Sequence, residues 1–144
     1  MTATMPTNAL EPASFETTVL FADTDAGGMV YFGSYARFVE NAVRQWFDFN
    51  KHAYLGKKNN FWVVRRLNVL YSESFRYGDL LEVNCDIDRI RRYSLDFKVN
   101  IRAKNRKTKN VAAMVTFALI DLATHKPLPM PHPIFSHSAK YRID

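Results

Sequence analysis

One segment constrains the fold more than any other, the amphipathic stretch that begins at residue 34. Apolar residues recur there every three or four positions, which is the spacing of one face of an α-helix. They are Tyr35, Phe38, Val39, Ala42, Val43, Trp46 and Phe47. This stripe is wide and aromatic, so it needs a large apolar surface to cover it. No other segment predicts a comparable helix, and we therefore expect that surface to be a β-sheet.

The rest of the chain predicts strands. A first strand is expected at 15–21, and four more at 61–75, 80–90, 93–103 and 111–122, where apolar residues alternate or run on continuously. Four prolines between 127 and 133 predict an extended tail without regular structure. The sequence therefore predicts an α+β fold, with a five-stranded antiparallel sheet around one long helix. We expect a single domain over residues 15–144, preceded by a disordered lead-in at 1–14.

Length and composition favour some classes of function over others. The chain has 144 residues, 47% of them hydrophobic, which suffices for one domain with a core. A formal charge of +6 favours anionic partners such as nucleic acid, an anionic membrane face or a phosphorylated ligand. The single cysteine, Cys85, excludes an internal disulfide framework, and its place in an alternating strand predicts a core residue.

Several kinds of site and compartment are not expected. The four histidines share no metal spacing, and neither a Walker pattern nor GxGxxG is present, so we expect no metal and no cofactor. No apolar run reaches the roughly 18 to 20 residues that span a bilayer, so no membrane span is expected. The first residues lack the basic start and apolar middle of a signal peptide. We therefore expect a cytoplasmic protein.

The loop between the first strand and the helix holds two aspartates, Asp23 and Asp25, followed by Gly27 and Gly28. Aspartate is common in turns and before helices, so spacing alone favours an ordinary loop. A chemical alternative exists. The glycines would let a ligand approach the backbone, and free N–H groups at the helix start would hold an oxyanion. A carboxylate facing those donors could act as a nucleophile or a base.

The wider context of this loop decides between the two readings. Starting at Asp23 the chain reads DTDAGGMVYFGSYARFVE. This segment resembles the signature of the 4-hydroxybenzoyl-CoA thioesterase family of hotdog-fold proteins, which includes the YbgC-like acyl-CoA thioesterases. The residues in register are Asp23, Asp25, Gly28, Val30, Tyr31, Tyr35 and Glu40. The resemblance implies a hotdog fold and hydrolysis of acyl-CoA by a homodimer or homotetramer, with active sites at the dimer interface.

The resemblance also implies roles for single residues in the loop. Asp25 corresponds to the catalytic carboxylate, as nucleophile or general base, and the backbone N–H of Phe32 corresponds to the group that polarises the thioester carbonyl. Tyr31 and Gly33 would shape the turn, and Gly28 would make room for the substrate.

Two acidic residues of the same signature are expected to be structural. We expect Asp23 to cap the strand end or the loop. Some hotdog thioesterases use a glutamate of the helix as the catalytic base, but those lack the loop aspartate. We therefore expect Glu40 to fix the loop by accepting hydrogen bonds.

Arginines are expected to contact the carrier and the acyl group. Arg91 and Arg92 match the strand-to-strand turn where the family has basic residues for the phosphates of CoA, and Ser94 would add a hydrogen bond. Arg65 and Arg66 stand where the family has small or apolar residues around the acyl site. Strand alternation would turn one outward and leave the other to meet an anionic or hydroxylated acyl group. The basic segment 104–109 is expected to be a solvated hairpin turn.

Several alternatives stay open at this point. Many YbgC-like members have histidine where this chain has Phe32. The replacement of that histidine by an aromatic residue favours an aromatic acyl group. Acyl carrier protein could replace CoA as the carrier. The protein could also be a non-catalytic hotdog protein that binds a thioester or scaffolds a complex, but the intact Asp25 disfavours this alternative. A basic, aromatic sheet could also bind single-stranded RNA by stacking. No RNP-type motif is present, so we expect no nucleic-acid partner.

Overall fold

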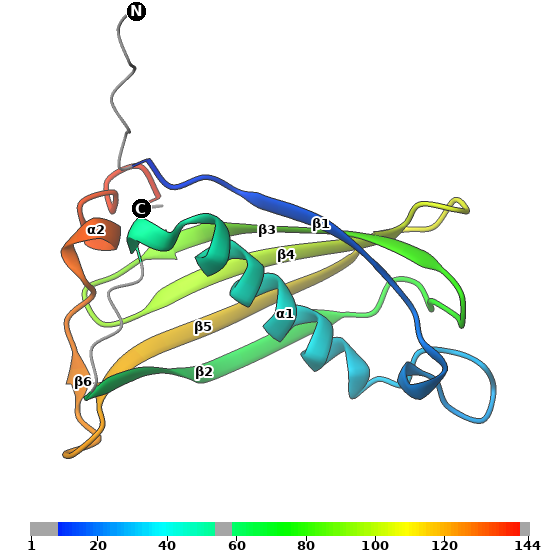
Figure 1. Cartoon of the computed structure of the whole chain (residues 1–144), viewed down its shortest axis with the longest axis horizontal. Helices are drawn as coiled ribbons and strands as arrows, with labels where there is room; N and C mark the ends of the chain where they lie inside the picture. The colour runs from blue at the N-terminus through cyan, green and yellow to red at the C-terminus, as the bar shows by residue number, and fades with distance from the viewer. Residues whose placement is uncertain (1–8, 54–58, 142–144) are drawn as a thin grey trace, which may run out of the picture.

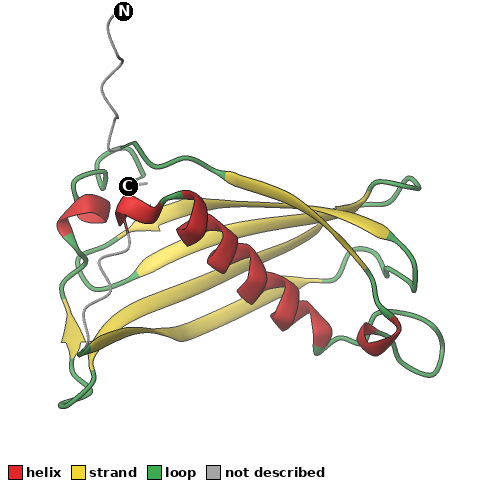
Figure 2. Cartoon of the chain, viewed as in Figure 1, coloured by secondary structure: helices red, strands yellow, loops and turns green. Residues whose placement is uncertain are grey.

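The computed structural model describes residues 9–53 and 59–141. Most of the expected lead-in and part of the polar connection after the helix lie outside these residues. One long helix lies across one face of a curved antiparallel sheet (Figure 1). Figure 2 shows that the other described helical segments are short and lie near the ends of the long helix. The α+β architecture predicted from the helix stripe is confirmed.

The sheet is built from the five predicted strands and one short addition. The strands are β1 (Ala13–Thr18), β2 (Asn60–Leu70), β3 (Leu80–Ile90), β4 (Leu95–Ala103), β5 (Val111–Asp121) and β6 (Pro127–Leu128). The spatial order is β1-β3-β4-β5-β2, and β6 pairs with β5. All pairs are antiparallel. In the described residues β1 and β2 therefore form the two edges of the main sheet.

Some strand ends differ from those expected. β1 begins at Ala13 rather than at residue 15, and ahead of it Leu10 is buried while the Glu11 backbone exchanges hydrogen bonds with the side chain of Asn50. β2 ends at Leu70 rather than at residue 75. β4 begins at Leu95 because the Arg91 N–H donates to the Ser94 carbonyl and closes a turn. As a result Tyr93 lies in the turn outside the strand and is half exposed.

The long helix, α1 (Ser34–Phe49), spans the predicted stripe. Its buried side chains include Phe38 and Trp46, and the Trp46 ring lies 5.0 Å from that of Phe97 on β4. Phe97 in turn contacts Phe117 of β5 at 5.9 Å. Burial of each large side chain contributes about 2 to 3 kcal/mol. The core therefore sits between α1 and the concave face of the sheet, and Cys85 is buried in it, where burial raises the pKa of its thiol.

The proline-rich tail has more structure than expected. After β6 it forms a short helix, α2 (His132–Phe135), with Pro131 at its N-cap. Proline is tolerated there because the first turn of a helix leaves its N–H groups unpaired in any case. The Met130 N–H donates to the Arg92 carbonyl, and Ile134 is fully buried. The tail therefore covers the end of the core where α1 ends (Figure 1).

Candidate active site

The loop before α1 is closed by Asp23. Its carboxylate is buried, accepts a hydrogen bond from the Leu20 N–H and pairs with Arg37. Its carbonyl accepts hydrogen bonds from the Tyr31 N–H and the Ser34 hydroxyl. Asp23 thus ties both ends of the loop and the first turns of the helix together. The structural role predicted for this residue is confirmed.

Asp25 is exposed in the middle of this loop. Its Oδ1 accepts hydrogen bonds from the Gly27 N–H at 2.9 Å and the Met29 N–H at 3.3 Å. Gly28, at a φ of +80°, makes the tight turn that brings these N–H groups round. Within the described residues Oδ2 of Asp25 accepts no hydrogen bond. One oxygen therefore orients the carboxylate, and the other is available for chemistry.

The start of α1 supplies hydrogen-bond donors close by in the sequence. Neither the Phe32 N–H nor the Gly33 N–H donates to an acceptor in the described part of the chain. Both lie at the positive end of the helix dipole. The Tyr31 ring lies against Gly33, where a Cβ atom would come within 2.6 Å of the ring. Gly33 therefore permits the position of that ring.

A second segment, 71–79, is hydrogen-bonded to this loop and holds it in position. The Val30 N–H donates to the Phe75 carbonyl at 2.8 Å, and the Tyr77 N–H donates to the Gly28 carbonyl at 3.2 Å. The Tyr71 hydroxyl donates to the Phe32 carbonyl at 3.4 Å. The position of Asp25 and of the helix start therefore depends on how segment 71–79 is held.

Segment 71–79 is held in turn by a buried ion pair. Asp79 is almost fully buried and accepts hydrogen bonds from the Arg76 N–H and from the guanidinium of Arg106, which also donates to the Ser74 carbonyl. Burial raises the pKa of Asp79, but the hydrogen bonds from Arg106 and Arg76 outweigh it and hold the pKa below its ordinary value. The expectation of a merely solvated turn at 104–109 is wrong for Arg106, because two turns distant in sequence meet at this end of the sheet.

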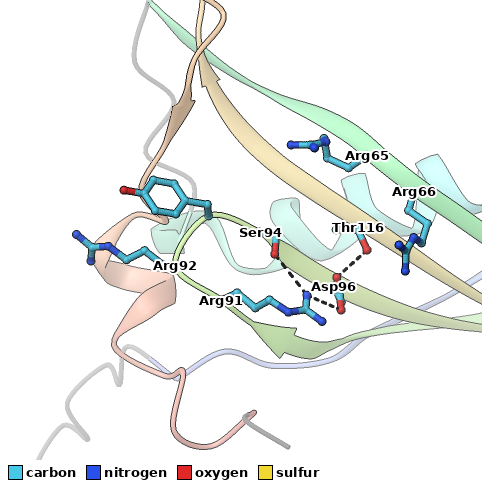
Figure 3. A pocket seen from close by; sticks show the side chains of 8 residues that line it. Arg65, Arg66, Arg91, Arg92, Ser94, Asp96 and Thr116 are labelled. Carbon is cyan, nitrogen blue, oxygen red and sulfur yellow. Dashed lines mark hydrogen bonds and ion pairs between the residues drawn. The ribbon is translucent and has the colours of Figure 1, made fainter.

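The four arginines expected to contact the carrier and the acyl group lie away from this loop. They line a cavity of about 610 Å³ on the face of the sheet opposite α1 (Figure 3). Its lining includes Arg65, Arg66, Arg91, Arg92 and Ser94.

The floor of this arginine pocket is a polar network. Asp96 is buried and accepts a hydrogen bond from Arg91 at 2.9 Å and another from the Thr116 hydroxyl at 2.7 Å. The Ser94 hydroxyl lies 3.4 Å from the same guanidinium, and the Arg92 guanidinium lies over the Phe135 ring. Arg91 is therefore held in place by Asp96.

A β-bulge explains why both arginines of β2 reach this pocket. Val64 pairs with Phe117 and Arg66 pairs with Thr116, so Arg65 is an extra residue in β2. A bulge interrupts the alternation of side chains between the two faces. The expectation that only one of the two arginines points outward is wrong, since Arg65 and Arg66 both line the outer pocket (Figure 3).

A second hollow, apolar and of about 540 Å³, lies between α1 and the edge strand β2. Phe47, Trp62 and Phe117 contribute to its wall, and Glu40 stands at it as well. Glu40 is exposed, and no hydrogen bond in the described residues joins it to the loop, so its expected role in fixing the loop is wrong. The stripe of α1 predicted the Phe47 side of this groove, but only the tertiary structure places Trp62 opposite.

The loop and the arginine pocket lie far apart within one chain. The loop is at the end of the sheet where α1 begins, and the Arg91–Ser94 turn is at the end where α1 terminates (Figure 1). A single chain therefore does not bring Asp25 together with the arginines.

No helix within 9–53 and 59–141 combines the length and the apolar character needed to cross a membrane. Across the same ranges, no three side chains of the His, Cys, Asp or Glu types gather in a way that could hold a metal ion.

Comparison with known proteins gives a consistent picture. The family model described as the thioesterase-like superfamily matches residues 19–136. The acyl-CoA thioester hydrolase YbgC of Escherichia coli is 33% identical over 119 residues, which cover 81% of this chain and 87% of that protein. The acyl-CoA thioesterase YbgC of Haemophilus influenzae is 28% identical over 82% of this chain and 88% of its own.

Solved structures agree on the fold. A 1,4-dihydroxy-2-naphthoyl-CoA thioesterase from Synechocystis superposes with a TM-score of 0.77 at 21% identity, covering 89% of this chain and 95% of its own. A probable thioesterase from Bartonella henselae gives a TM-score of 0.74 at 26% identity, covering 84% and 100% of the two chains. The matched family model, the shared sequence and the shared hotdog architecture show that this chain belongs to the thioesterase-like superfamily and is a thioester hydrolase.

Proposed function

We propose that this protein hydrolyses acyl-CoA thioesters, with Asp25 as nucleophile or general base and the Phe32 and Gly33 N–H groups as oxyanion donors. One observation carries the proposal. A carboxylate oxygen without a partner and two N–H groups without acceptors occur in one short, well-braced loop of the described chain. The names of the YbgC relatives support acyl-CoA as the substrate class.

The chemistry requires little from the protein because a thioester carbonyl is already activated. As the carbonyl carbon is attacked, negative charge gathers on its oxygen, where the free N–H groups at the start of α1 stabilise it. If Asp25 attacks, the CoA thiolate leaves and a mixed anhydride forms, which water then hydrolyses. If Asp25 is a base, it takes a proton from the attacking water. Either route ends in a free acid and a free thiol.

The complete site is proposed to form in a homodimer. β2 is an edge strand of the described sheet and exposes Val64, Leu67 and Leu70. An unpaired edge of this kind is a template for pairing with a second chain. A two-fold axis that pairs β2 with its copy reverses the strand direction, so the Asp25 loop of one subunit would lie beside the arginine pocket of the other. Arg91, Arg92 and Ser94 would then bind phosphate groups of CoA.

The acyl group is proposed to occupy the apolar groove between α1 and β2. Its wall carries the aromatic side chains of Phe47, Trp62 and Phe117, which suit a flat aromatic acyl group by stacking. Arg65 and Arg66 line the opposite face of the sheet, so they would contact the carrier rather than the acyl group.

Substitution of Asp25 tests the proposal. We expect Asp25→Asn to fold normally and to lower kcat by about a hundredfold or more, because the amide can neither attack nor take a proton. Release of free thiol from benzoyl-, naphthoyl- and aliphatic acyl-CoA measures this. Glu16→Gln, which removes a carboxylate from β1 outside the loop, is the matched control and should hydrolyse at the parent rate.

Three outcomes would contradict parts of the proposal. Hydrolysis by Asp25→Asn at the parent rate would remove Asp25 from the mechanism. Thiol release from acyl thioesters of acyl carrier protein, but not from those of CoA, would show that the carrier is acyl carrier protein. Absence of thiol release from every thioester by the parent protein would indicate a thioester-binding or scaffold protein.

A further inference from the structure

The bulge in β2 produces an unusual concentration of positive charge. A regular strand would place Arg65 and Arg66 on opposite faces of the sheet. The extra residue between Val64 and Arg66 brings both side chains to the outer face, at one cavity. Bulges are often found where a strand must re-aim a side chain beside a functional site.

The charges of these two arginines are not neutralised. In the described part of the chain, the side chains of Arg65 and Arg66 have no carboxylate and no hydrogen-bond partner. Three other basic residues in and after β4 are paired. Arg102 pairs with Glu82, Lys104 with Glu16 and Arg106 with Asp79. Arg65 and Arg66 therefore leave two uncompensated positive charges at the cavity.

The chemistry of the pocket points to several phosphate groups. Four arginines line it, whereas Asp96 is its one acidic residue and is already engaged by Arg91 and Thr116. Guanidinium groups bind phosphate oxygens in pairs and hold them more specifically than ammonium groups do. A cavity of about 610 Å³ is large enough for a nucleotide, whereas a single phosphodiester would leave most of it unfilled.

We propose that Arg65 and Arg66 form a carrier-recognition site for the phosphorylated nucleotide of CoA. The site selects CoA thioesters over thioesters of carriers that lack a nucleotide. It extends the Arg91 and Arg92 contacts onto a second strand and rests on the proposed thioesterase function. Arg65 and Arg66 act on binding of the carrier and take no part in the reaction.

A simpler role for the two arginines is protection of an edge strand. Charged side chains on an exposed edge discourage unwanted strand pairing. That role requires neither a shared cavity nor two arginines on one face, and it predicts no dependence on the carrier. Kinetics with different carriers therefore separate the two explanations.

The experiment compares one acyl group on three carriers: CoA, pantetheine and acyl carrier protein. We expect Arg65→Gln/Arg66→Gln to raise KM for acyl-CoA by about tenfold to a hundredfold, since each lost charge-assisted hydrogen bond costs about tenfold in binding. KM for the pantetheine thioester, which lacks the nucleotide, should stay constant. Arg65→Lys/Arg66→Lys should recover only part of the loss because lysine cannot bind two oxygens at once. Lys98→Gln removes a charge from β4 outside the pocket and serves as the control.

Direct binding of adenosine 3′,5′-bisphosphate, measured by calorimetry, gives a readout that does not require turnover. The parent protein should bind it and the double glutamine variant should bind it about tenfold or more weakly. Equal KM changes on all three carriers, or unchanged binding of the bisphosphate, would overturn the inference while leaving Asp25 chemistry intact. Binding of the bisphosphate by a protein that hydrolyses no thioester would instead overturn the proposed function and keep the nucleotide site.

Discussion

At the scale of single residues, the geometry around Asp25 depends on the backbone of Gly28. Its φ of +80° is a conformation that side chains with a Cβ atom adopt only with strain, although the space around it is open. We expect Gly28→Ala to lower the free energy of unfolding by about 1 kcal/mol and to reduce turnover, because the turn that orients the carboxylate loosens. Urea unfolding and thiol release measure the two effects. Gly27→Ala is the comparison, since its Cβ atom would make only an ordinary contact at 3.4 Å with Asp25. Equal destabilisation by the two changes would contradict the strain argument.

The contact between Gly33 and Tyr31 makes a second prediction at this scale. A Cβ atom on Gly33 would overlap the Tyr31 ring, and the ring would have to move. We expect Gly33→Ala to destabilise the parent protein but to be tolerated in a Tyr31→Ala background. The two substitutions should couple by about 0.5 kcal/mol or more in a double-mutant cycle of unfolding free energies. Strict additivity would show that the ring does not rest against Gly33.

At the scale of elements, the Asp79–Arg106 pair joins the turn between β4 and β5 to the segment under the active-site loop. Arg106→Gln removes charge-assisted hydrogen bonds from an almost fully buried carboxylate. We expect it to lower the free energy of unfolding at neutral pH by about 2 kcal/mol. Arg102→Gln, which breaks a more exposed pair with Glu82, should cost less than about 1 kcal/mol.

The pKa of Asp79 sets the pH dependence of this effect. The carboxyl has a pKa below its ordinary value of 3.8 in the folded protein. Its ionised form therefore stabilises the fold above that value, and the contribution is lost as pH falls through the lowered pKa. The difference in free energy of unfolding between the parent protein and Arg106→Gln, measured by denaturant titration, should therefore shrink below about pH 3. A difference that stayed constant into acid would show that the ion pair is not its origin.

The elements themselves were largely predictable, and the exceptions have physical causes. The spacing from Tyr35 to Phe47 predicted α1 because one face of the helix is buried and the other is solvated. The bulge at Arg65 was not predicted, since a single extra residue leaves no periodic signal. The short helix α2 was missed because prolines at the start of a helix look, in sequence, like prolines that prevent one.

At the scale of the whole molecule, the separation of the Asp25 loop from the arginine pocket makes a prediction about assembly. A chain with Asp25→Asn keeps its arginines, and a chain with Arg91→Gln/Arg92→Gln keeps its aspartate. If each site combines both subunits, a mixed dimer contains one intact site. At an acyl-CoA concentration far below the parent KM, each variant alone should turn over slowly. Refolding the two variants together in equal amounts should then restore about a quarter of the parent activity, because half of the dimers are mixed and each has one intact site. Thiol release measures the recovery.

Controls distinguish a shared site from other causes of recovery. A mixture of Asp25→Asn chains with chains carrying both the aspartate and the arginine substitutions should stay inactive, since no intact site can form. Mass measurement shows whether the mixture of Asp25→Asn and Arg91→Gln/Arg92→Gln chains contains mixed dimers. If mixed dimers are present and no activity is recovered, the whole site lies within one chain.

The sequence alone determined the fold class, the long helix, the main strands and the family, because hydrophobic periodicity and the Asp23–Glu40 signature are local. It also identified Asp25 and the arginines as candidates, since those residue types stand in register with a known pattern. The tertiary structure decided how they are arranged. The β2 bulge turned Arg65 and Arg66 to one face, Arg106 was brought to Asp79, and Asp25 and the arginine pocket were set at opposite ends of the sheet. These relations depend on strand register and on contacts between distant turns, which no local pattern of residues records.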